Sequence, residues 1–396
     1  MSTLTVAVAL LVSACSGGSE DKPSPDKTPP AGAATLEPAW EESGGQPVWL
    51  TDDFVVTNSQ NTLVALDLDD GTEQWSTPAP DGLTICATSP EVNDDGLAGL
   101  LLGNPGQACE TAAAIDTSTG DVKWTQQFEN PLDLEQPTDA VSVGDDALVA
   151  VSCATARFSL ADGGELEPFF EDDTECVYHE AVAAEGTVII KEPDGGESNI
   201  DLVAYDGDTG EELWRRPADR SDEPYEIVNL EPLVLDILEE GVPAIRTVDD
   251  EGNLGAELGR QNEGYSGQRA GIAKVIDNKV VVAELGKGDR SMTVYDIATG
   301  DEVGSRALGK DERLIGLYDD GILTERPAAD DSLFAAELLY SELTDLDQVS
   351  LLGRGDWRPG FSSYAVAGDR LIVSPPNTIA AIPIPAEEGR KPVDAP

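Results

Sequence analysis

The chain has 396 residues, of which 40% are hydrophobic and 26% are charged, so it is long and apolar enough to build a large core. Its 77 acidic and 24 basic residues give a formal net charge of −53, which excludes nucleic acid and anionic membrane surfaces as expected partners. We interpret this charge as a solubilising surface for a high-salt or cell-surface setting, the alternative being a specific cationic partner.

The first 14 residues are predicted to be a signal peptide rather than part of the fold. Residues 4–12 form an apolar run that is too short to span a bilayer. The run ends in Val12-Ser13-Ala14-Cys15, and this ending resembles the lipobox of bacterial lipoproteins. A departure is that residues 1–14 contain neither Lys nor Arg, which signal peptides carry near their start. The resemblance implies cleavage before Cys15, lipidation of its thiol and a position at the outer face of the cytoplasmic membrane.

The segments at both ends of the remaining chain are predicted to be unstructured. Residues 16–33 consist mostly of Pro, Ser, Gly and charged residues, so residues 15–33, with the lipidated Cys15, are expected to be a disordered tether. As a flexible coil, such a tether reaches on the order of 20–25 Å. Residues 387–396 are expected to be a flexible tail, which leaves residues 34–386 for the fold.

A unit recurs within residues 34–386: an apolar strand, an Asp-containing turn that ends in Gly, and a short strand that ends in Trp. It reads LVALDLDDGTEQW at 63–75, AAAIDTSTGDVKW at 112–124 and LVAYDGDTGEELW at 202–214. A fourth copy, MTVYDIATGDEVG at 292–304, has Gly304 in place of the Trp. Each copy predicts a β-hairpin, and the Trp of the first three copies needs a pocket that a neighbouring sheet can supply. The repeat residues are turn glycines Gly71, Gly120, Gly210 and Gly300 and tryptophans Trp75, Trp124 and Trp214.

The period of the repeat predicts the architecture. Two degenerate copies, with turn glycines Gly163 and Gly252, fall at the positions that the period predicts. For Gly252 the sequence leaves open whether it lies in the same hairpin as the other glycines or in another turn of the blade. Units of 42–49 residues with short strands rich in Val, Ile, Leu and Thr are typical of β-propellers. Helical solenoids share such periods, but their units are helix pairs.

We predict an all-β fold of eight four-stranded antiparallel blades, the alternative being seven blades. Units at 332–353 and 370–385 supply the seventh and eighth blades. The last unit ends after its third strand, so its outer strand is expected from residues 35–41, where Trp40 takes the place of the repeat Trp. Such closure between the two ends of the chain removes an open sheet edge.

Four cysteines remain after Cys15, an even number that fits an exported, oxidising setting. We predict the disulfides Cys86–Cys109 and Cys153–Cys176, each with a sequence separation of 23. The alternative pair is Cys109–Cys153, which would link neighbouring blades. Zinc binding is the rival interpretation, but the chain has no C-x-x-C and only one His.

No residue pattern identifies a catalytic, cofactor or metal site. The single histidine, His179, is expected to be a packed or solvated strand residue. Nucleophile-elbow, zinc-protease, Walker and dinucleotide-binding patterns are absent from the sequence. The Asp-rich turns at 67–71 and 206–210 lack the spacing and the final Glu of an EF-hand, so we interpret them as ordinary turns.

The units ALDLDDGTEQW, AIDTSTGDVKW and AYDGDTGEELW resemble the repeat of pyrroloquinoline quinone (PQQ)-like β-propellers, commonly ALD-x-x-TG-x-x-x-W. Thr119-Gly120, Thr209-Gly210 and Thr299-Gly300 match its TG pair, whereas the first copy has Asp70-Gly71. The resemblance covers residues 34–386 and implies the propeller fold. The family includes dehydrogenases that use PQQ and calcium, non-enzymatic lipoproteins such as the propeller subunit of the outer-membrane β-barrel assembly machinery, and kinase sensor domains, so it does not fix a function.

We therefore expect an exported, lipid-anchored, non-enzymatic propeller without a cofactor. Its expected partner is an envelope or extracellular protein, and its membrane contact is the lipid alone. The alternatives are an envelope sensor domain that binds a small ligand and, less favoured, a PQQ-dependent oxidoreductase, because the adjacent-cysteine disulfide of the alcohol dehydrogenases has no counterpart in this chain. Candidate binding loops are residues 91–96 and 192–198, which we place near the face that carries the cysteines.

Overall fold

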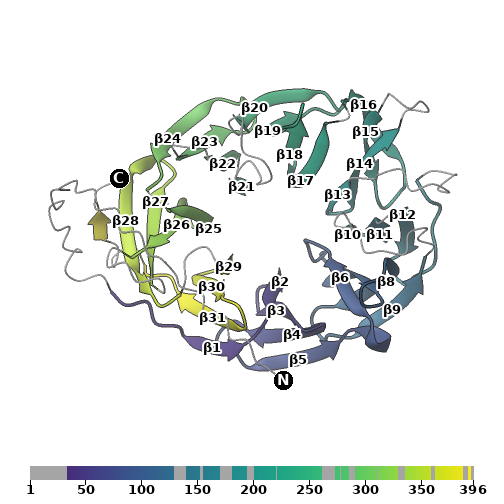
Figure 1. Cartoon of the computed structure of the whole chain (residues 1–396), viewed down its shortest axis with the longest axis horizontal. Helices are drawn as coiled ribbons and strands as arrows, with labels where there is room; N and C mark the ends of the chain where they lie inside the picture. The colour runs from purple at the N-terminus through teal and green to yellow at the C-terminus, as the bar shows by residue number, and fades with distance from the viewer. Residues whose placement is uncertain are drawn as a thin grey trace, which may run out of the picture. The chain divides into compact units, whose positions relative to one another are not determined.

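Eight antiparallel sheets follow one another around a ring in the computed structural model (Figure 1). The described residues are 34–128, 140–151, 155–169, 181–193, 200–219, 221–260, 273–276, 278–284, 290–309, 311–328, 335–357, 362–386 and 391–393. The expected signal peptide, Cys15 and the expected tether lie outside them. The all-β fold with eight blades, predicted from the repeat, is confirmed.

Seven of the eight blades run from an inner strand A to an outer strand D (Figure 1). Within the described residues blade 3 has three strands, A to C, and blade 7 has a fifth strand, so these two blades differ from the predicted four. In this order, blade 1 contains β2 (Gln46–Leu50), β3 (Phe54–Ser59), β4 (Thr62–Asp67) and β5 (Glu73–Pro78), and blade 2 contains β6 (Thr84–Thr88), β7 (Leu97–Gly103), β8 (Cys109–Asp116) and β9 (Val122–Gln127). Blade 3 contains β10 (Ala140–Val143), β11 (Ala147–Val151) and β12 (Thr155–Ser159), and blade 4 contains β13 (Ala181–Ala184), β14 (Thr187–Pro193), β15 (Ile200–Asp206) and β16 (Glu212–Ala218). Blade 5 contains β17 (Glu223–Leu230), β18 (Leu233–Glu239), β19 (Val242–Val248) and β20 (Leu254–Arg260), and blade 6 contains β21 (Ala273–Ile276), β22 (Lys279–Glu284), β23 (Ser291–Asp296) and β24 (Glu302–Ala307). Blade 7 contains β25 (Arg313–Tyr318), β26 (Gly321–Pro327), β27 (Ala336–Glu342), β28 (Asp345–Gly355) and β32 (Lys391–Val393), and blade 8 contains β29 (Ser363–Ala367), β30 (Arg370–Ser374), β31 (Thr378–Pro383) and β1 (Trp40–Ser43).

The core lies between neighbouring blades. Middle strands such as β11, with the sequence ALVAV, are buried at every position because a sheet covers each of their faces. The cluster that joins blades 1 and 2 contains Trp49 and Val56 from the first and Leu100 and Ile115 from the second. Outer strands such as β5 are exposed at alternate positions, which explains their polar sequences.

The first and last parts of the ring close against each other, as predicted. Strand β1 pairs with β31 in antiparallel register, from Trp40 opposite Ala381 to Ser43 opposite Thr378. The outer strand was expected over residues 35–41 but begins only at Trp40. Pro38 has no N–H to donate to a sheet, and the residues before it belong to another blade, where Thr35 forms a parallel bridge with Arg354 of β28.

Part of the expected flexible tail is a strand. Residues 391–393 form β32, which pairs with Val349–Leu351 on the outer edge of β28. The N–H of Leu36 also donates to the carbonyl of Arg354 on that strand. Segments from both ends of the chain therefore cover the outer edge of blade 7, where a long strand would otherwise present unpaired backbone groups.

Connections between strands divide the ring into two faces. Because neighbouring strands are antiparallel, the A–B and C–D connections lie on one face, which we call the C–D face. The B–C connections and the crossings from strand D to the next strand A lie on the other, which we call the B–C face. The turn that holds Gly252 joins β19 to β20, so this copy of the repeat is the same C–D hairpin as the others.

Candidate functional site

The repeat tryptophans fasten each blade to the next. The indole Nε1 of Trp75 on β5 donates to the carbonyl of Thr117 in blade 2, at 2.9 Å. Its ring lies against Gly120, which has a φ of +75°, so that a Cβ there would come within 2.5 Å of the ring. Trp40 and Trp124 make the same bond to Leu68 and Leu160, three residues before Gly71 and Gly163. The rings are therefore occupied between blades and do not form a ligand surface.

Arginine replaces tryptophan at the junction of blades 3 and 4. The position that matches the repeat Trp in blade 3 is Glu167, and the guanidinium of Arg157 on β12 lies against Gly210 instead. Its Nε donates to the carbonyl of Gly207 at 2.9 Å, three residues before the turn glycine, just as the indoles do. Its Nη2 donates to Asp208 and its Nη1 to Glu167. Sequence reasoning missed this residue because Arg157 comes from strand C, outside the repeat register.

Buried ion pairs fasten two further junctions. Arg306 of blade 6 contacts Glu312 at 2.6 Å, and both side chains are almost completely buried. The carboxylate of Glu312 also accepts from Thr324 of blade 7 and from the N–H of Gly309. Arg216 and Asp222 have the same spacing at the end of blade 4, with 3.8 Å between their charged atoms. These charged pairs lie where one blade crosses to the next and contribute to blade packing.

One of the two predicted disulfides lies within the described residues. Cys86 on β6 and Cys109 on β8 are bonded, which ties the inner strand of blade 2 to its third strand. Cys153, Cys176 and His179 lie outside the described residues. The candidate loop at 91–96 joins strands A and B of blade 2 on the C–D face. Of the other candidate stretch, Glu192 lies at the end of β14 that points to the B–C face, and residues 194–198 lie outside the described residues. The two stretches therefore do not begin on one face, although a shared face was expected.

Glu91, in the first of these loops, reaches across to blade 3. Its Oε1 accepts from the hydroxyl of Ser142 at 2.8 Å and from the N–H of Val143 at 3.1 Å. The Ser142 hydroxyl in turn accepts from the N–H of Gly186 in blade 4. Burial raises the pKa of the Glu91 carboxyl, although the bonds from Ser142 and Val143 act in the opposite direction. This carboxylate thus links three blades at the C–D face.

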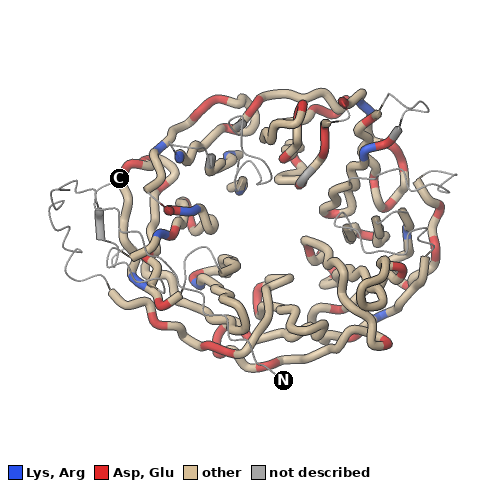
Figure 2. The backbone as a smooth tube through the Cα atoms, in the orientation of Figure 1, with Lys and Arg blue, Asp and Glu red and all other residues tan. Residues whose placement is uncertain are grey.

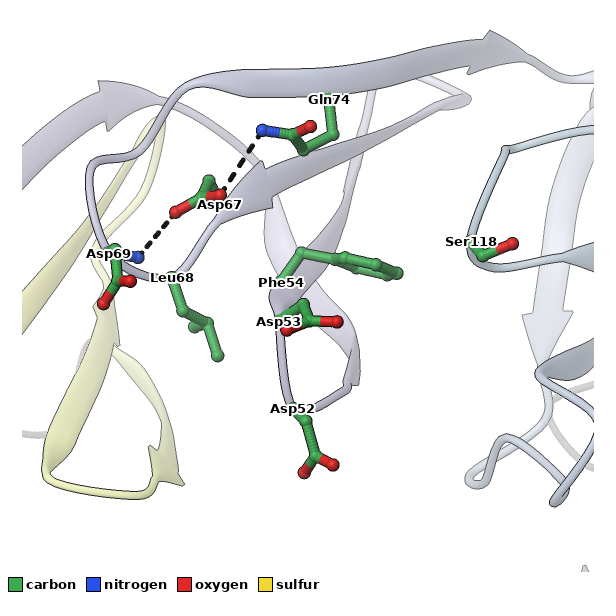
Figure 3. A pocket seen from close by; sticks show the side chains of 8 residues that line it. All are labelled: Asp52, Asp53, Phe54, Asp67, Leu68, Asp69, Gln74 and Ser118. Carbon is green, nitrogen blue, oxygen red and sulfur yellow. Dashed lines mark hydrogen bonds between the residues drawn. The ribbon is translucent and has the colours of Figure 1, made fainter.

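An acidic pocket opens on the C–D face between blades 1 and 2 (Figure 3). Its volume is about 320 Å³, and Asp52, Asp53, Asp67 and Asp69 of blade 1 line it, with Ser118 of blade 2 on the far side. The Asp67 carboxylate accepts from the N–H of Asp69 and the amide of Gln74, so it shapes the turn. Asp69 also pairs with Arg370 of blade 8 at 2.7 Å. Among the described residues no cluster of His, Cys, Asp or Glu is suited to hold a metal ion.

The whole C–D face shares this acidity. No Lys or Arg occurs in the A–B and C–D connections between the described strands, whereas most of them contain Asp or Glu. Figure 2 shows acidic positions around the full ring and few basic ones. A partner at this face would therefore meet an excess of carboxylates, of which Asp69 and Asp116 are paired with Arg370 and Lys123 at the adjoining strand ends.

A second pocket, of about 540 Å³, opens on the B–C face between blades 8 and 1. Three segments line it: residues 43–46 where the chain crosses from β1 to β2, residues 58–60 at the β3–β4 hairpin, and residues 374–377 at the β30–β31 hairpin. None of its lining residues is charged. Sequence reasoning missed it because its walls come from opposite ends of the chain and carry no motif.

Neither pocket suits the quinone of the PQQ-dependent enzymes. That cofactor carries several carboxylates, which need cationic partners when they are removed from water. The residues that line the two pockets include no Lys, Arg or His. Among the described residues no helix is long and apolar enough to cross a membrane.

Comparisons with known proteins match part of the chain to one family model and its fold to solved propellers. Residues 29–167 match the family model described as outer membrane protein assembly factor BamB. The crystal structure of BamB from Moraxella catarrhalis aligns with a TM-score of 0.52 at 14% identity, over 88% of this chain and 98% of that one. The C-terminal WD40 domain of Sif2 aligns with a TM-score of 0.58 at 10% identity, over 90% and 100% of the two chains. The WD40 domain of SCAP from fission yeast aligns with a TM-score of 0.50 at 10% identity, over 89% and 98%. No curated protein sequence matches the chain. The resemblance to PQQ-like β-propellers, stated from the repeat, is confirmed.

Proposed function

We propose that the chain is a cell-envelope lipoprotein whose non-enzymatic propeller serves as a scaffold for another envelope protein, held at the outer face of the cytoplasmic membrane by a lipid on Cys15. The observation that carries this proposal is the match of residues 29–167 to the family model of an assembly factor. The matched segment begins in the expected tether and continues through blades 1 and 2 into blade 3. The lipobox-like sequence before Cys15 supplies the anchor.

The construction of the ring supports a scaffold. Trp75 and Trp124 lock successive blades through one hydrogen bond and one close ring contact each. The C–D turns to which they dock are held by backbone bonds such as that from Gly120 to Asp116. Rigid blades present their connecting loops in fixed positions, and a preorganised surface loses little conformational entropy when a partner binds.

The lipid anchor is tested by expressing the full chain and a Cys15→Ala variant in a bacterial host with a clickable palmitate analogue. We expect label on the wild-type chain alone, together with its recovery in the membrane fraction. Without lipid the variant has only its polar surface, so it is expected in the soluble exported fraction. Equal labelling or equal fractionation of the two chains would contradict the anchor.

The scaffold is tested by photo-crosslinking from single positions in the anchored protein. A photoreactive residue at Asp53 or Glu251 probes the C–D face, and one at Glu240 probes the B–C face. The control is Leu213 on the outer strand of blade 4, where the side chain is 49% exposed. We expect one face to give a discrete crosslinked protein that Leu213 does not give. Absence of a discrete product from both faces would contradict the proposal.

A further inference from the structure

The uncharged pocket between blades 8 and 1 stands apart from the rest of the surface. The chain carries a net charge of −53, and 26% of its residues are charged. None of the lining residues of this pocket is charged; amide and hydroxyl groups, glycine and proline make up the whole lining. We call it the seam groove, because it lies where the two ends of the chain meet.

The walls of the seam groove are held in place by bonds across the seam. The hydroxyl of Ser374 donates to the carbonyl of Gly45 at 2.8 Å, and the N–H of Gly44 donates to the carbonyl of Asn377 at 3.3 Å. Gly45 passes so close to Asn58 that any Cβ would collide with its backbone. The groove is therefore a preformed part of the ring rather than a gap between loose loops.

The chemistry of the lining indicates the class of ligand. Gln46, Asn58, Gln60 and Asn377 present side-chain amides, each with a donor and an acceptor. A hydroxyl group is likewise both donor and acceptor, so adjacent hydroxyls match such amides without any charge. Pro375 adds an apolar ring surface, against which the C–H face of a sugar ring can pack.

Asn58 provides a second, independent indication that a hydrogen-bonding ligand binds in the seam groove. It lines the groove, and its Oδ1 is buried without a hydrogen-bond partner in the described part of the chain. A buried acceptor left without a donor costs free energy, which a hydroxyl from a ligand would recover once the Asn58 side chain turns this oxygen into the groove. An ionic ligand would find no counter-charge in the groove, and a mainly apolar one would leave its amides unpaired.

We propose that the seam groove binds a neutral oligosaccharide, through hydrogen bonds from its amides and through packing on Pro375. The volume of about 540 Å³ is that of a small-ligand site and leaves room for a few sugar residues. This site is independent of the scaffold function, because it needs neither the lipid anchor nor a protein partner.

Two positions allow the amides to be removed without disturbing the fold. Gln60 has a φ of +52° and Asn377 a φ of +79°, and glycine adopts this conformation more readily than either. A Gln60→Gly/Asn377→Gly variant is therefore expected to keep its stability while it loses two amides of the groove. The matched control is Glu240→Gly, at a φ of +52° in the two-residue B–C hairpin of blade 5, outside the groove.

The test is calorimetric titration of the full chain in mild detergent with neutral tetrasaccharides: β-1,4-linked glucose, β-1,4-linked N-acetylglucosamine and α-1,4-linked glucose. We expect at least one to bind with a Kd below about 1 mM, and the double variant to weaken that binding by at least about tenfold. Glu240→Gly is expected to bind like the wild type. Circular dichroism melting of the three proteins establishes that they are equally folded.

Three results would overturn the proposal. The first is that none of the tetrasaccharides binds at millimolar concentration. The second is that the folded double variant binds a tetrasaccharide as tightly as the wild type does. The third is that a neutral Ser- and Asn-rich peptide binds in a way the double variant abolishes while the sugars do not bind, which would assign the groove to peptides.

Discussion

At the scale of single residues, Arg157 shows how one side chain can take over the role of another. It supplies the blade 3–4 junction with the donor that an indole supplies elsewhere, and it adds bonds that an indole cannot make. Its guanidinium also stands 5.4 Å from the centre of the Phe169 ring. The sequence around Arg157 does not indicate this role. The role depends on which strand of blade 3 faces the C–D turn of blade 4, and only the folded structure shows that.

We expect Arg157→Ala to lower the free energy of unfolding by about 2–3 kcal/mol, because it leaves the carbonyls of Gly207 and Asp208 without a donor. Arg157→Lys should recover only part of this loss, since a single ammonium cannot reproduce the fork of a guanidinium. Urea unfolding followed by tryptophan fluorescence measures both. If the alanine variant were as stable as the wild type, the assigned role of Arg157 would be wrong.

Glu91 predicts a dependence of stability on pH. Burial raises the pKa of its carboxyl, so the folded chain holds this proton more tightly than the unfolded chain does. The contribution of Glu91 to stability is therefore largest below the ordinary carboxyl pKa of about 4.3 and falls as the pH rises through the raised value.

Glu91→Gln removes this dependence while keeping an acceptor for Ser142 and Val143. We expect the variant to gain stability relative to the wild type above the raised pKa, and to lose that advantage below about pH 4. Urea midpoints measured across this range test the prediction. Asp95→Asn, at an exposed acid of the same loop, is the control for simple loss of one negative charge. A gain that is independent of pH would contradict the assignment.

At the scale of the element, the C–D hairpin is the unit that the sequence predicts best. Its turn glycine and its tryptophan have separate tasks in two different blades, and their fixed spacing is what made the repeat visible. Blade 6 departs from this pattern, because Gly304 replaces the Trp and the side chain of Leu346 from blade 7 lies near it. The hairpin survives there because the turn depends on Gly300 rather than on the ring.

We expect Gly120→Ala to lower the free energy of unfolding by more than about 1 kcal/mol, because alanine disfavours a positive φ and its Cβ would meet the Trp75 ring. Gly106→Ala is a matched control, since Gly106 has a φ of +74° but nothing within 4 Å of an added Cβ. The difference between the two variants in thermal or urea unfolding measures the clash alone. Equal losses would show that the ring contact does not contribute to stability.

The sequence predicted those elements that repeat and missed those that occur once. The period of the turn glycines gave the number of blades and the closing strand, because each copy encodes the same local hairpin. It gave neither β32 nor the bridge of Thr35 to Arg354, because these pairings depend on which outer edge lies within reach of a short segment. It could not give the seam groove, whose facing residues Gly45 and Ser374 meet only when the ring closes.

At the scale of the whole molecule, stability depends on the seam. Trp40 packs with Val55 and Leu66 of blade 1 and with Ile372 and Ile379 of blade 8 in one cluster. Strand β1 is thus both the outer strand of one blade and an anchor on the next. Loss of this short segment exposes apolar surface on two blades and leaves β31 as an open edge.

Deletion of residues 1–43 should therefore destabilise the ring far more than deletion of residues 1–33, which leaves β1 in place. Loss of the buried Trp40 alone is expected to cost about 3–5 kcal/mol. We expect the shorter chain to melt at a lower temperature and to elute as oligomers in size-exclusion chromatography, because β31 can pair with another copy. A monomeric chain with an unchanged melting temperature would refute the role of the seam.

The seam also sets the order in which the protein can be completed during synthesis. The indole of Trp40 bonds to the carbonyl of Leu68, so β1 can dock on blade 1 as soon as that blade has emerged. Its hydrogen-bonding edge then waits for β31, which lies far later in the chain. A newborn chain therefore carries an unpaired strand until β31 has emerged, and a chain that is terminated before β31 keeps it. Any quality-control protease or chaperone that recognises open strand edges would thus distinguish finished from unfinished copies at this one place.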